Sequence, residues 1–290
     1  MLLLLACSGP ADTGAPSMTV ATFNTGLGSA EGQVLETSDT WYGNGLAWLP
    51  ALEAAQTWAS QIQPDLVVFQ EIFDPAECVD IPEEARAGFV CEHWAEGDPH
   101  VALQVLGEGY SLSCHPGNTD KCLAIRDGFG SFDEAWGGSV EGCGSGARVA
   151  RVHVEGPSGP MTLVNVHGSS GLDSDSSACR VKQVEQVFLD LGDGEPAIDG
   201  ARNLVMGDLN TDPGRFAGSD DSAVRWNDFV GADHALHWHT EVGPDAPGSY
   251  AGLADIDHVA SDAFVGPCEV GPKPDEAFDH RPVHCTLELP

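Results

Sequence analysis

The chain has 290 residues, of which 45 are acidic and 12 are basic, so its formal net charge at pH 7 is −33. No basic stripe runs along the sequence, and the electrostatic footprint of a protein that holds nucleic-acid backbone tightly is therefore absent. Such acidity is typical of a soluble surface, including one adapted to salt, which screens self-repulsion beyond about 10 Å at 0.1 M. The alternative is a surface that favours neutral or cationic substrates.

The first residues are similar to the end of a bacterial lipoprotein signal, because four leucines and an alanine precede Cys7. Cys7 would then be the lipidated residue and the only membrane attachment. A signal segment normally has about 15–30 residues and a basic start, so this one is short, and a chance apolar terminus is the alternative. We expect residues 1–17 to be a signal remnant and flexible tether, and residues 18–290 to form the folded domain. The protein is expected to be exported, as a cell-envelope lipoprotein or in secreted form.

Eight cysteines remain when Cys7 is set aside. An even number in an exported chain indicates disulfide bonds, and the lack of a Cys-x-x-Cys pair argues against a zinc ribbon. We expect nearest neighbours in the sequence to pair, first of all Cys268 with Cys285, because both flank the last strands. Eight reduced thiols in a cytosolic protein are the alternative.

Apolar runs and periodicity predict the elements of the first half. A strand is predicted at Thr19–Phe23, followed by a glycine-rich loop over residues 26–45. Apolar residues at helical spacing predict a helix over residues 46–63, which Pro64 ends, and the apolar run Leu66–Gln70 predicts the next strand.

Residues 74–145 are the least regular part of the chain and contain five of the eight cysteines. We expect disulfide-tied loops here, with short strands at His100–Leu106 and Lys121–Ile125. Loops on a rigid scaffold often determine specificity, so this region is expected to select the substrate.

The second half begins with a predicted hairpin of Arg148–Val154 and Met161–Val166, with the five-residue loop Gly156–Pro160 between them. An apolar stripe predicts a helix over Ser177–Leu191. Further apolar runs predict strands at Asn203–Met206, Ala254–Ile256 and Val283–Leu289.

Polar motifs adjoin five of the predicted strands. A rigid sheet holds side chains at its strand ends in fixed positions, so we expect these motifs to gather in one site. In chain order they are Phe23-Asn24, Gln70-Glu71, Gly207-Asp208-Leu209-Asn210, Asp257-His258 and Asp279-His280-Arg281-Pro282-Val283.

Five such motifs, in this order and strand context, resemble those of the endonuclease/exonuclease/phosphatase superfamily, whose members are metal-dependent hydrolases of phosphate esters. The resemblance covers about residues 19–289. It implies an α+β fold of four layers, a sandwich in which two packed, mainly antiparallel β-sheets are flanked by helices. It also implies attack by activated water, with no covalent enzyme intermediate.

Hydrolysis of an anionic phosphodiester needs a cation, a base and donors for the developing oxyanion. Glu71 is the expected metal ligand, because a hard carboxylate at a rigid strand end suits Mg²⁺ or Mn²⁺. The resemblance adds Asn24 and Asp279 to that metal site. A structural Ca²⁺ near residues 173–175 or 220–221 is a further candidate, but neither segment has a full loop of oxygen ligands, so solvated turns are expected there.

His280 is the expected general base, because an imidazole with an ordinary pKa near 6.5 accepts a proton from water at neutral pH. The resemblance assigns Asp257 as the carboxylate that orients it. His258, beside Asp257, points to the opposite face if this segment is a strand, so we expect it to be a core or rim histidine.

Asp208 and Asn210 alternate at a predicted strand end and would face the same side. The resemblance implies that they orient the nucleophile and bind the phosphoryl oxygens. It also implies that His167, at another strand end, donates to a phosphate oxygen or protonates the leaving group. The resemblance also implies a phosphate-binding arginine at Arg148, a role that a planar guanidinium suits. Arg151 competes for this role, strand alternation does not choose between them, and an ion pair with one of the many carboxylates is the alternative.

These observations predict an exported, divalent-metal-dependent phosphodiesterase that acts on nucleic acid or phospholipid. The deoxyribonuclease-like and sphingomyelinase-like branches of the superfamily both fit the motifs. A phosphomonoesterase acting on inositol phosphates is an alternative, although only three lysines are present to build its basic pocket. A non-catalytic surface binding module on the same fold is the other alternative. We expect the protein to be a monomer.

Overall fold

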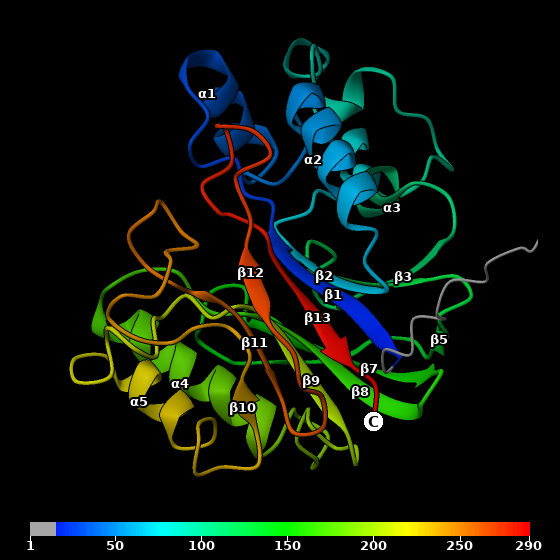
Figure 1. Ribbon diagram of the computed structural model, residues 1–290. Coiled ribbons are helices and arrows are strands. Elements are labelled where there is room, and N and C mark those ends of the chain that lie inside the picture. Colours follow the sequence, from blue (N-terminus) through cyan, green and yellow to red (C-terminus); the bar gives the residue numbers. More distant parts are fainter. Residues whose placement is uncertain (1–15) are drawn as a thin grey trace, which may run out of the picture.

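The computed structural model describes residues 16–290 as two β-sheets packed against each other, with helices on both outer faces (Figure 1). The first sheet has six strands in the order β12-β13-β1-β2-β4-β3. The pair β1–β2 is parallel and the other pairs are antiparallel. The strands are β1 (Ser17–Asn24), β2 (Leu66–Gln70), β3 (Tyr110–Cys114), β4 (Cys122–Arg126), β12 (Cys268–Val270) and β13 (Val283–Glu288).

The second sheet has seven strands in the order β10-β11-β9-β8-β7-β5, and β6 also pairs with β7. The pair β8–β9 is parallel and the others are antiparallel. The strands are β5 (Ser131–Phe132), β6 (Trp136–Ser139), β7 (Ala147–Gly156), β8 (Gly159–His167), β9 (Asn203–Asp208), β10 (His237–Trp238) and β11 (Asp257–Ser261).

Apolar helix faces cover the outer side of each sheet. Helices α2 and α3 pack on the first sheet, and α4 and α5 pack on the second. The helices are α1 (Gly32–Trp41), α2 (Leu49–Ile62), α3 (Val101–Leu106), α4 (Ser174–Phe188) and α5 (Asp221–Asn227), with short 3₁₀ helices at Pro75–Val79, Glu83–Ala85 and Val90–Glu92.

Strand β2 shows how the sequence fills the layers between these elements. Leu66 and Val68 face the second sheet, whereas Val67 and Phe69 face the helices. Both faces of β2 are buried, which explains why its sequence is continuously apolar. The predicted four-layer α+β sandwich is confirmed.

Two predictions in the first half were wrong. Residues 100–106 form a helix, α3, rather than a strand, because His100 Nδ1 accepts the Ala102 N–H as an N-terminal cap and the apolar residues pack towards α2. The glycine-rich loop over residues 26–45 contains α1.

In the second half, the hairpin loop has two residues rather than five, since β7 ends at Gly156 and β8 begins at Gly159. The predicted strand at Ala254–Ile256 was also wrong. The strand begins at Asp257, so this site residue starts a strand instead of following one. Helix α4 begins three residues before its predicted start at Ser177.

Four disulfide bonds join nearest neighbours in the sequence, as predicted. Three of them involve the irregular region before β7, and the fourth links β12 to β13. The bonds are Cys78–Cys91, Cys114–Cys122, Cys143–Cys179 and Cys268–Cys285.

Replacing Cys143 and Cys179 together by serine is expected to lower the free energy of unfolding by about 4 kcal/mol. This bond closes the longest of the four loops, 36 residues, and therefore restricts the unfolded chain most. The matched double replacement removes the Cys268–Cys285 bond, which closes a loop of 17 residues. It is expected to lower the free energy of unfolding by about 3 kcal/mol. Urea unfolding of the full chain measures both, and a Cys143/Cys179 variant as stable as the parent would contradict the loop-closure argument.

The predicted signal remnant and most of the tether lie in residues 1–15, outside the part of the chain that the structure describes. Within residues 16–290, none of the helices has both the length and the apolar character needed to span a membrane.

Candidate active site

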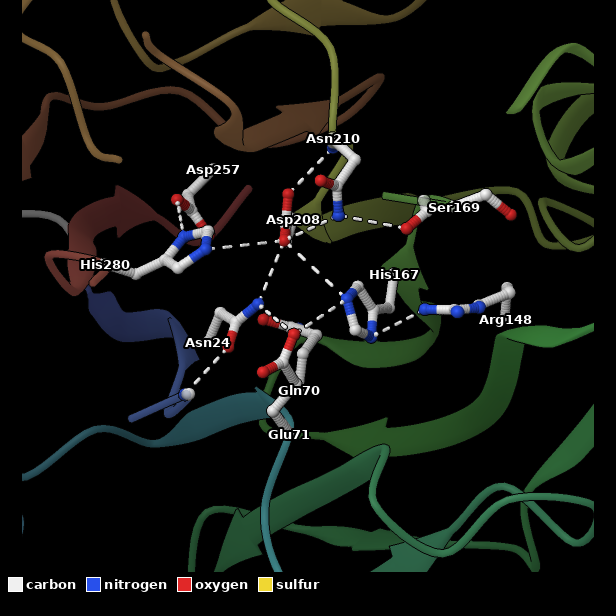
Figure 2. Close-up of polar contacts among 12 residues, drawn as sticks. Asn24, Gln70, Glu71, Arg148, His167, Ser169, Asp208, Asn210, Asp257 and His280 are labelled. Atoms are coloured by element: carbon white, nitrogen blue, oxygen red, sulfur yellow. Dashed lines mark hydrogen bonds and ion pairs between the residues drawn. The ribbon is translucent and has the colours of Figure 1, made fainter. Parts of the chain in front are cut away.

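Polar side chains gather where the central strands of both sheets end (Figure 2). In the first sheet Asn24 is in register with Gln70, and in the second sheet His167 is in register with Asp208. Asp257, at the start of antiparallel β11, also pairs with Asp208. Asn24 Nδ2 donates to Asp208 Oδ2 at 2.9 Å and so joins the two sheets across the site.

Three side-chain oxygens converge beside Gly26. A Cβ at this glycine would collide with Glu71 Oε2 and would lie 3.2 Å from both Asn24 Oδ1 and Asp279 Oδ1. Asp279 Oδ1 is buried without a hydrogen-bond partner, and Glu71 has a left-handed backbone with φ of 54° that only its surroundings can impose. Two carboxylates and a carboxamide around a gap left by glycine are the oxygen donors that Mg²⁺ or Mn²⁺ prefers, so these residues fit a divalent cation.

The two carboxylates of this cluster differ in their electrostatics. Burial favours the neutral form of Glu71, but hydrogen bonds from His167 and Asn24 and the charge of His280 keep its pKa below the usual value. Burial raises the pKa of Asp279 to about 6, and Glu71 adds to this shift while His280 opposes it. Asp279 therefore carries an unfavourable charge at neutral pH, which a bound cation would neutralise.

His280 lies between two buried carboxylates. Its Nδ1 is 2.7 Å from Asp257 Oδ2, and its Nε2 is 3.7 Å from Asp208 Oδ2. Burial opposes protonation of the imidazole, but Asp257, Asp208 and Asp279 outweigh it and raise the pKa of His280 to about 10. The His280 ring is therefore protonated at neutral pH as long as these three carboxylates keep their negative charge. Neutralising Asp279 would lower the pKa of His280.

Asp208 is fully buried at the centre of the site. Its Oδ2 accepts from Asn24 Nδ2 and Asn210 Nδ2, each at 2.9 Å, and its Oδ1 accepts from the Asn210 N–H at 2.7 Å. Burial raises the pKa of Asp208 to about 7, with His280 opposing and Asp257 adding to the shift. Leu209 points into the core, so Asp208 and Asn210 meet on the same side, as predicted.

The tautomer of His167 follows from its neighbours. Burial lowers the pKa of His167 to about 4, so the ring is neutral at neutral pH. Arg148 Nη1 lies 3.3 Å from Nδ1, and a guanidinium only donates, so Nδ1 accepts and Nε2 carries the proton. That Nε2–H faces Glu71 Oε1 at 3.4 Å and Asp208 Oδ2 at 3.7 Å.

Solved structures match this arrangement of strands and helices over nearly the whole chain. Humanised TDP2 of D. rerio matches with a TM-score of 0.61 at 13% identity, covering 94% of this chain and 99% of that one. The human Nocturnin catalytic domain with bound sulfate matches with a TM-score of 0.56 at 13% identity, covering 94% of each chain. Beta toxin of Staphylococcus aureus matches with a TM-score of 0.54 at 11% identity, covering 92% of this chain and 99% of that one.

The chain therefore shares its fold with these three proteins. No protein-family model matches it, and no curated protein matches it significantly.

The structure brings every predicted site residue to one edge of the sandwich. Arg151 does not belong to the group, because it pairs with Asp193 and Asp199 instead. The gathered residues are Asn24, Glu71, Arg148, His167, Asp208, Asn210, Asp257, Asp279 and His280.

Other polar features of the sequence have structural partners. His258 is buried, with Nδ1 2.8 Å from Thr240 Oγ1 and Nε2 2.9 Å from the Asp255 carbonyl oxygen, so it is a core histidine. Asp173 and Asp220, considered for Ca²⁺, accept backbone N–H groups as the N-caps of α4 and α5.

Sequence analysis assigned no supporting role to Gln70 and missed Asn165 and Ser249, which support this site. Gln70 Nε2 donates to Asn165 Oδ1 at 2.7 Å, and Asn165 Nδ2 donates to the Phe69 carbonyl oxygen at 2.9 Å, which ties the two sheets together beneath the site. Ser249 Oγ accepts the Asp257 N–H and fixes the start of β11. Asn165 is a polar residue inside the apolar run of β8, and this interruption of the run was the signal that could have identified it.

Tyr250 was also missed. Its ring centroid lies 4.8 Å from that of His280, and 38% of the residue is exposed. It is one of only three tyrosines, but no motif connects it to the site.

Proposed function

We propose that this protein is an exported, divalent-metal-dependent phosphodiesterase in which activated water attacks phosphorus directly. The observation that carries the proposal is that three oxygens converge beside Gly26 at the same edge where His280 is paired with Asp257. Similar folds support it, since D. rerio TDP2 has been solved with a single-strand DNA product and human Nocturnin with a sulfate anion.

Glu71, Asn24 and Asp279 would hold the cation, Mg²⁺ or Mn²⁺. Such a cation, when bound, neutralises charge on the phosphate and favours attack on it by water. His280 Nε2 is placed to accept the proton of the attacking water, while Asp257 holds Nδ1 and orients the ring. Asp257, Asp208 and Asp279 raise the pKa of His280, and a cation held by Asp279 would favour the deprotonated ring that can act as the base.

Asp208 and Asn210 position the water and the phosphate. The buried Asp208 carboxylate faces His280 Nε2, so a water between them would be oriented by both. His167 presents an N–H to the same space and donates to a phosphate oxygen or to the leaving group. Arg148 keeps His167 in this tautomer and adds the positive charge that a phosphate oxygen needs.

Nucleic acid and phospholipid remain the two substrate classes within this proposal. Export is supported by the four disulfide bonds, which persist in oxidising compartments. We further propose that the folded domain begins near residue 18, that the protein is a monomer, and that lipidation of Cys7 provides any membrane attachment.

The test is hydrolysis of plasmid DNA, RNA, sphingomyelin and an inositol polyphosphate by the full chain with Mg²⁺, with Mn²⁺ and with EDTA. We expect turnover of a phosphodiester that EDTA abolishes and that added Mg²⁺ or Mn²⁺ restores. Activity that persists in EDTA would contradict the metal assignment. A folded chain that binds the cation but hydrolyses none of these substrates would contradict the proposed activity and favour a binding module.

A further inference from the structure

The basic side chains of this protein are almost all engaged inside the fold. Six of the 12 form ion pairs with carboxylates, namely Lys121, Arg126, Arg151, Arg180, Arg215 and Arg225. Another three donate to backbone carbonyl oxygens, namely Arg86, Arg202 and Arg281. Of the remaining three in the described chain, only Arg148 contacts the candidate site. Its Nε donates to the Ser145 carbonyl oxygen, and its Nη1 lies against His167. A polyanion therefore finds one available arginine beside the reacting phosphate and no basic groove.

The surface next to the metal ligand Glu71 is acidic. A cavity of about 120 Å³ beside it is also lined by Asp74, Glu77 and Asp120. Partial burial raises the pKa of Glu77, and the charges of Asp74 and Asp120 raise it further. A second phosphate on this side of the reacting phosphate would meet Asp74 and Glu77, two carboxylates that the cation site does not use, whereas Asp120 is paired with Lys121.

The surface over His280 includes an aromatic and an apolar side chain. Tyr250 packs its ring on the imidazole and remains partly exposed. Leu253, in the same turn, is 77% exposed. The turn is held in place because the Ala251 N–H donates to the backbone carbonyl oxygen of Asp279. A substrate group that extends past His280 therefore meets an aromatic ring and an apolar side chain.

We infer that this site, acting as the phosphodiesterase proposed above, selects diesters that carry a single phosphate with uncharged substituents and discriminates against polynucleotides. One phosphate is matched by the cation site, by Arg148 and by the N–H of His167. Each further phosphate adds repulsion from the acidic wall and from a chain of net charge −33. Because this repulsion acts through solvent, salt weakens it.

Two substrates with the same scissile bond test the inference. One is the p-nitrophenyl ester of thymidine 5′-monophosphate, and the other is an oligothymidylate that carries the same ester at its 5′ end. At low salt we expect kcat/KM for the oligomer to be about 10- to 1,000-fold lower than that for the monomer. This is the range over which surface charge changes association rates. Raising the salt is expected to increase kcat/KM for the oligomer and to change that for the monomer by less than about twofold.

A charge-neutralising variant supplies the second measurement. Asp74→Asn combined with Glu77→Gln is expected to raise kcat/KM for the oligomer at low salt by about tenfold and to leave the monomer unchanged. The matched control, Glu155→Gln with Glu288→Gln, removes the same charge from exposed positions at the strand ends opposite the site. The control pair is expected to leave the ratio of the kcat/KM values for the two substrates within about twofold of the ratio for the parent.

The outcomes separate this inference from the proposed function. Preference for the oligomer, with kcat/KM that falls steeply as salt rises, would overturn the substrate class and leave the phosphodiesterase standing. An equal gain on the oligomer from the control pair would also overturn it, because the acidic wall beside Glu71 would then have no special role. Hydrolysis of neither ester with Mg²⁺ or Mn²⁺ would overturn the proposed function and this inference together.

Discussion

Replacing His280 by alanine is expected to lower kcat by about 10²- to 10⁴-fold, the usual contribution of a positioned acid–base group. His280 is placed to transfer a proton because its Nδ1 is held by Asp257 and its Nε2 faces Asp208. KM is expected to change little, since the imidazole is required to move a proton and not to hold the ground-state phosphate. Steady-state hydrolysis of the preferred diester at saturating Mg²⁺ measures both constants.

A companion variant separates orientation from proton transfer. Asp257→Asn keeps the shape of the side chain but removes the charge that favours protonated His280, so it is expected to lose less activity than His280→Ala. It is also expected to shift the pH dependence of kcat to lower pH, because Asp257 raises the pKa of His280.

His153→Ala is the matched control for His280→Ala. His153 is a histidine held by two carboxylates, Asp133 and Asp199, but it is half-exposed and lies towards the far end of β7 from Arg148. Its loss is expected to leave kcat unchanged. Activity of His280→Ala within about tenfold of the parent would exclude His280 as the base and would direct attention to Asp208, whose pKa is raised to about 7.

The predictions that succeeded rest on features that are local in the sequence. Continuous apolar runs such as Leu66–Gln70 identify buried strands because both faces are covered. A polar residue directly after such a run, such as Glu71, is held by a rigid element, so its position at the edge of the sheet could be predicted before its partners were known.

The failures occurred where packing overrides local preference. The segment Val101–Leu106 is a short, largely apolar run like that of a buried strand, but its cap at His100 and its contacts with α2 make it helical. Helix α1 has serine and threonine residues and no side-chain cap, so the sequence carries almost no helical signal.

The strand-end positions of the motifs predicted that they gather in one site, but not which side chains contact each other there. Nothing in the spacing of Asn24 and Asp208 indicates that one donates to the other, because that contact depends on how the two sheets pack. The choice of Arg148 over Arg151 likewise needed the structure, which occupies Arg151 with Asp193 and Asp199. Tyr250 reaches His280 through a turn that no sequence pattern describes.

Replacing Asp279 by asparagine is expected to stabilise the cation-free protein while removing its activity. Burial and the charge of Glu71 raise the pKa of Asp279 from 3.8 to about 6, so the ionised carboxylate destabilises the fold at neutral pH. The destabilisation is absent below pH 3.8, grows as the pH rises towards about 6 and is constant above that. Asp279→Asn is therefore expected to gain about 2–3 kcal/mol in EDTA at pH 7, and no gain at low pH.

The same substitution removes a ligand from the proposed cation site. Saturating Mg²⁺ or Mn²⁺ stabilises the parent by mass action, by about 2.7 kcal/mol at 100 times the dissociation constant. Asp279→Asn is expected to show none of this stabilisation by the cation, and its kcat/KM is expected to be at least about 100-fold lower than that of the parent. Thermal unfolding with EDTA and with added cation, beside diester hydrolysis, measures all three quantities.

Glu71→Gln provides the contrast that makes this prediction specific. Glu71 is a proposed ligand too, but favourable neighbours lower its pKa, so its neutralisation should not stabilise the cation-free protein. Both variants should lose the cation response, and only Asp279→Asn should gain stability in EDTA. An Asp279→Asn protein that keeps the cation response of the parent would exclude Asp279 as a ligand. An Asp279→Asn variant that is less stable than the parent in EDTA would show that the Asp279 carboxylate stabilises the fold. It would then not be a ligand held in place for a cation.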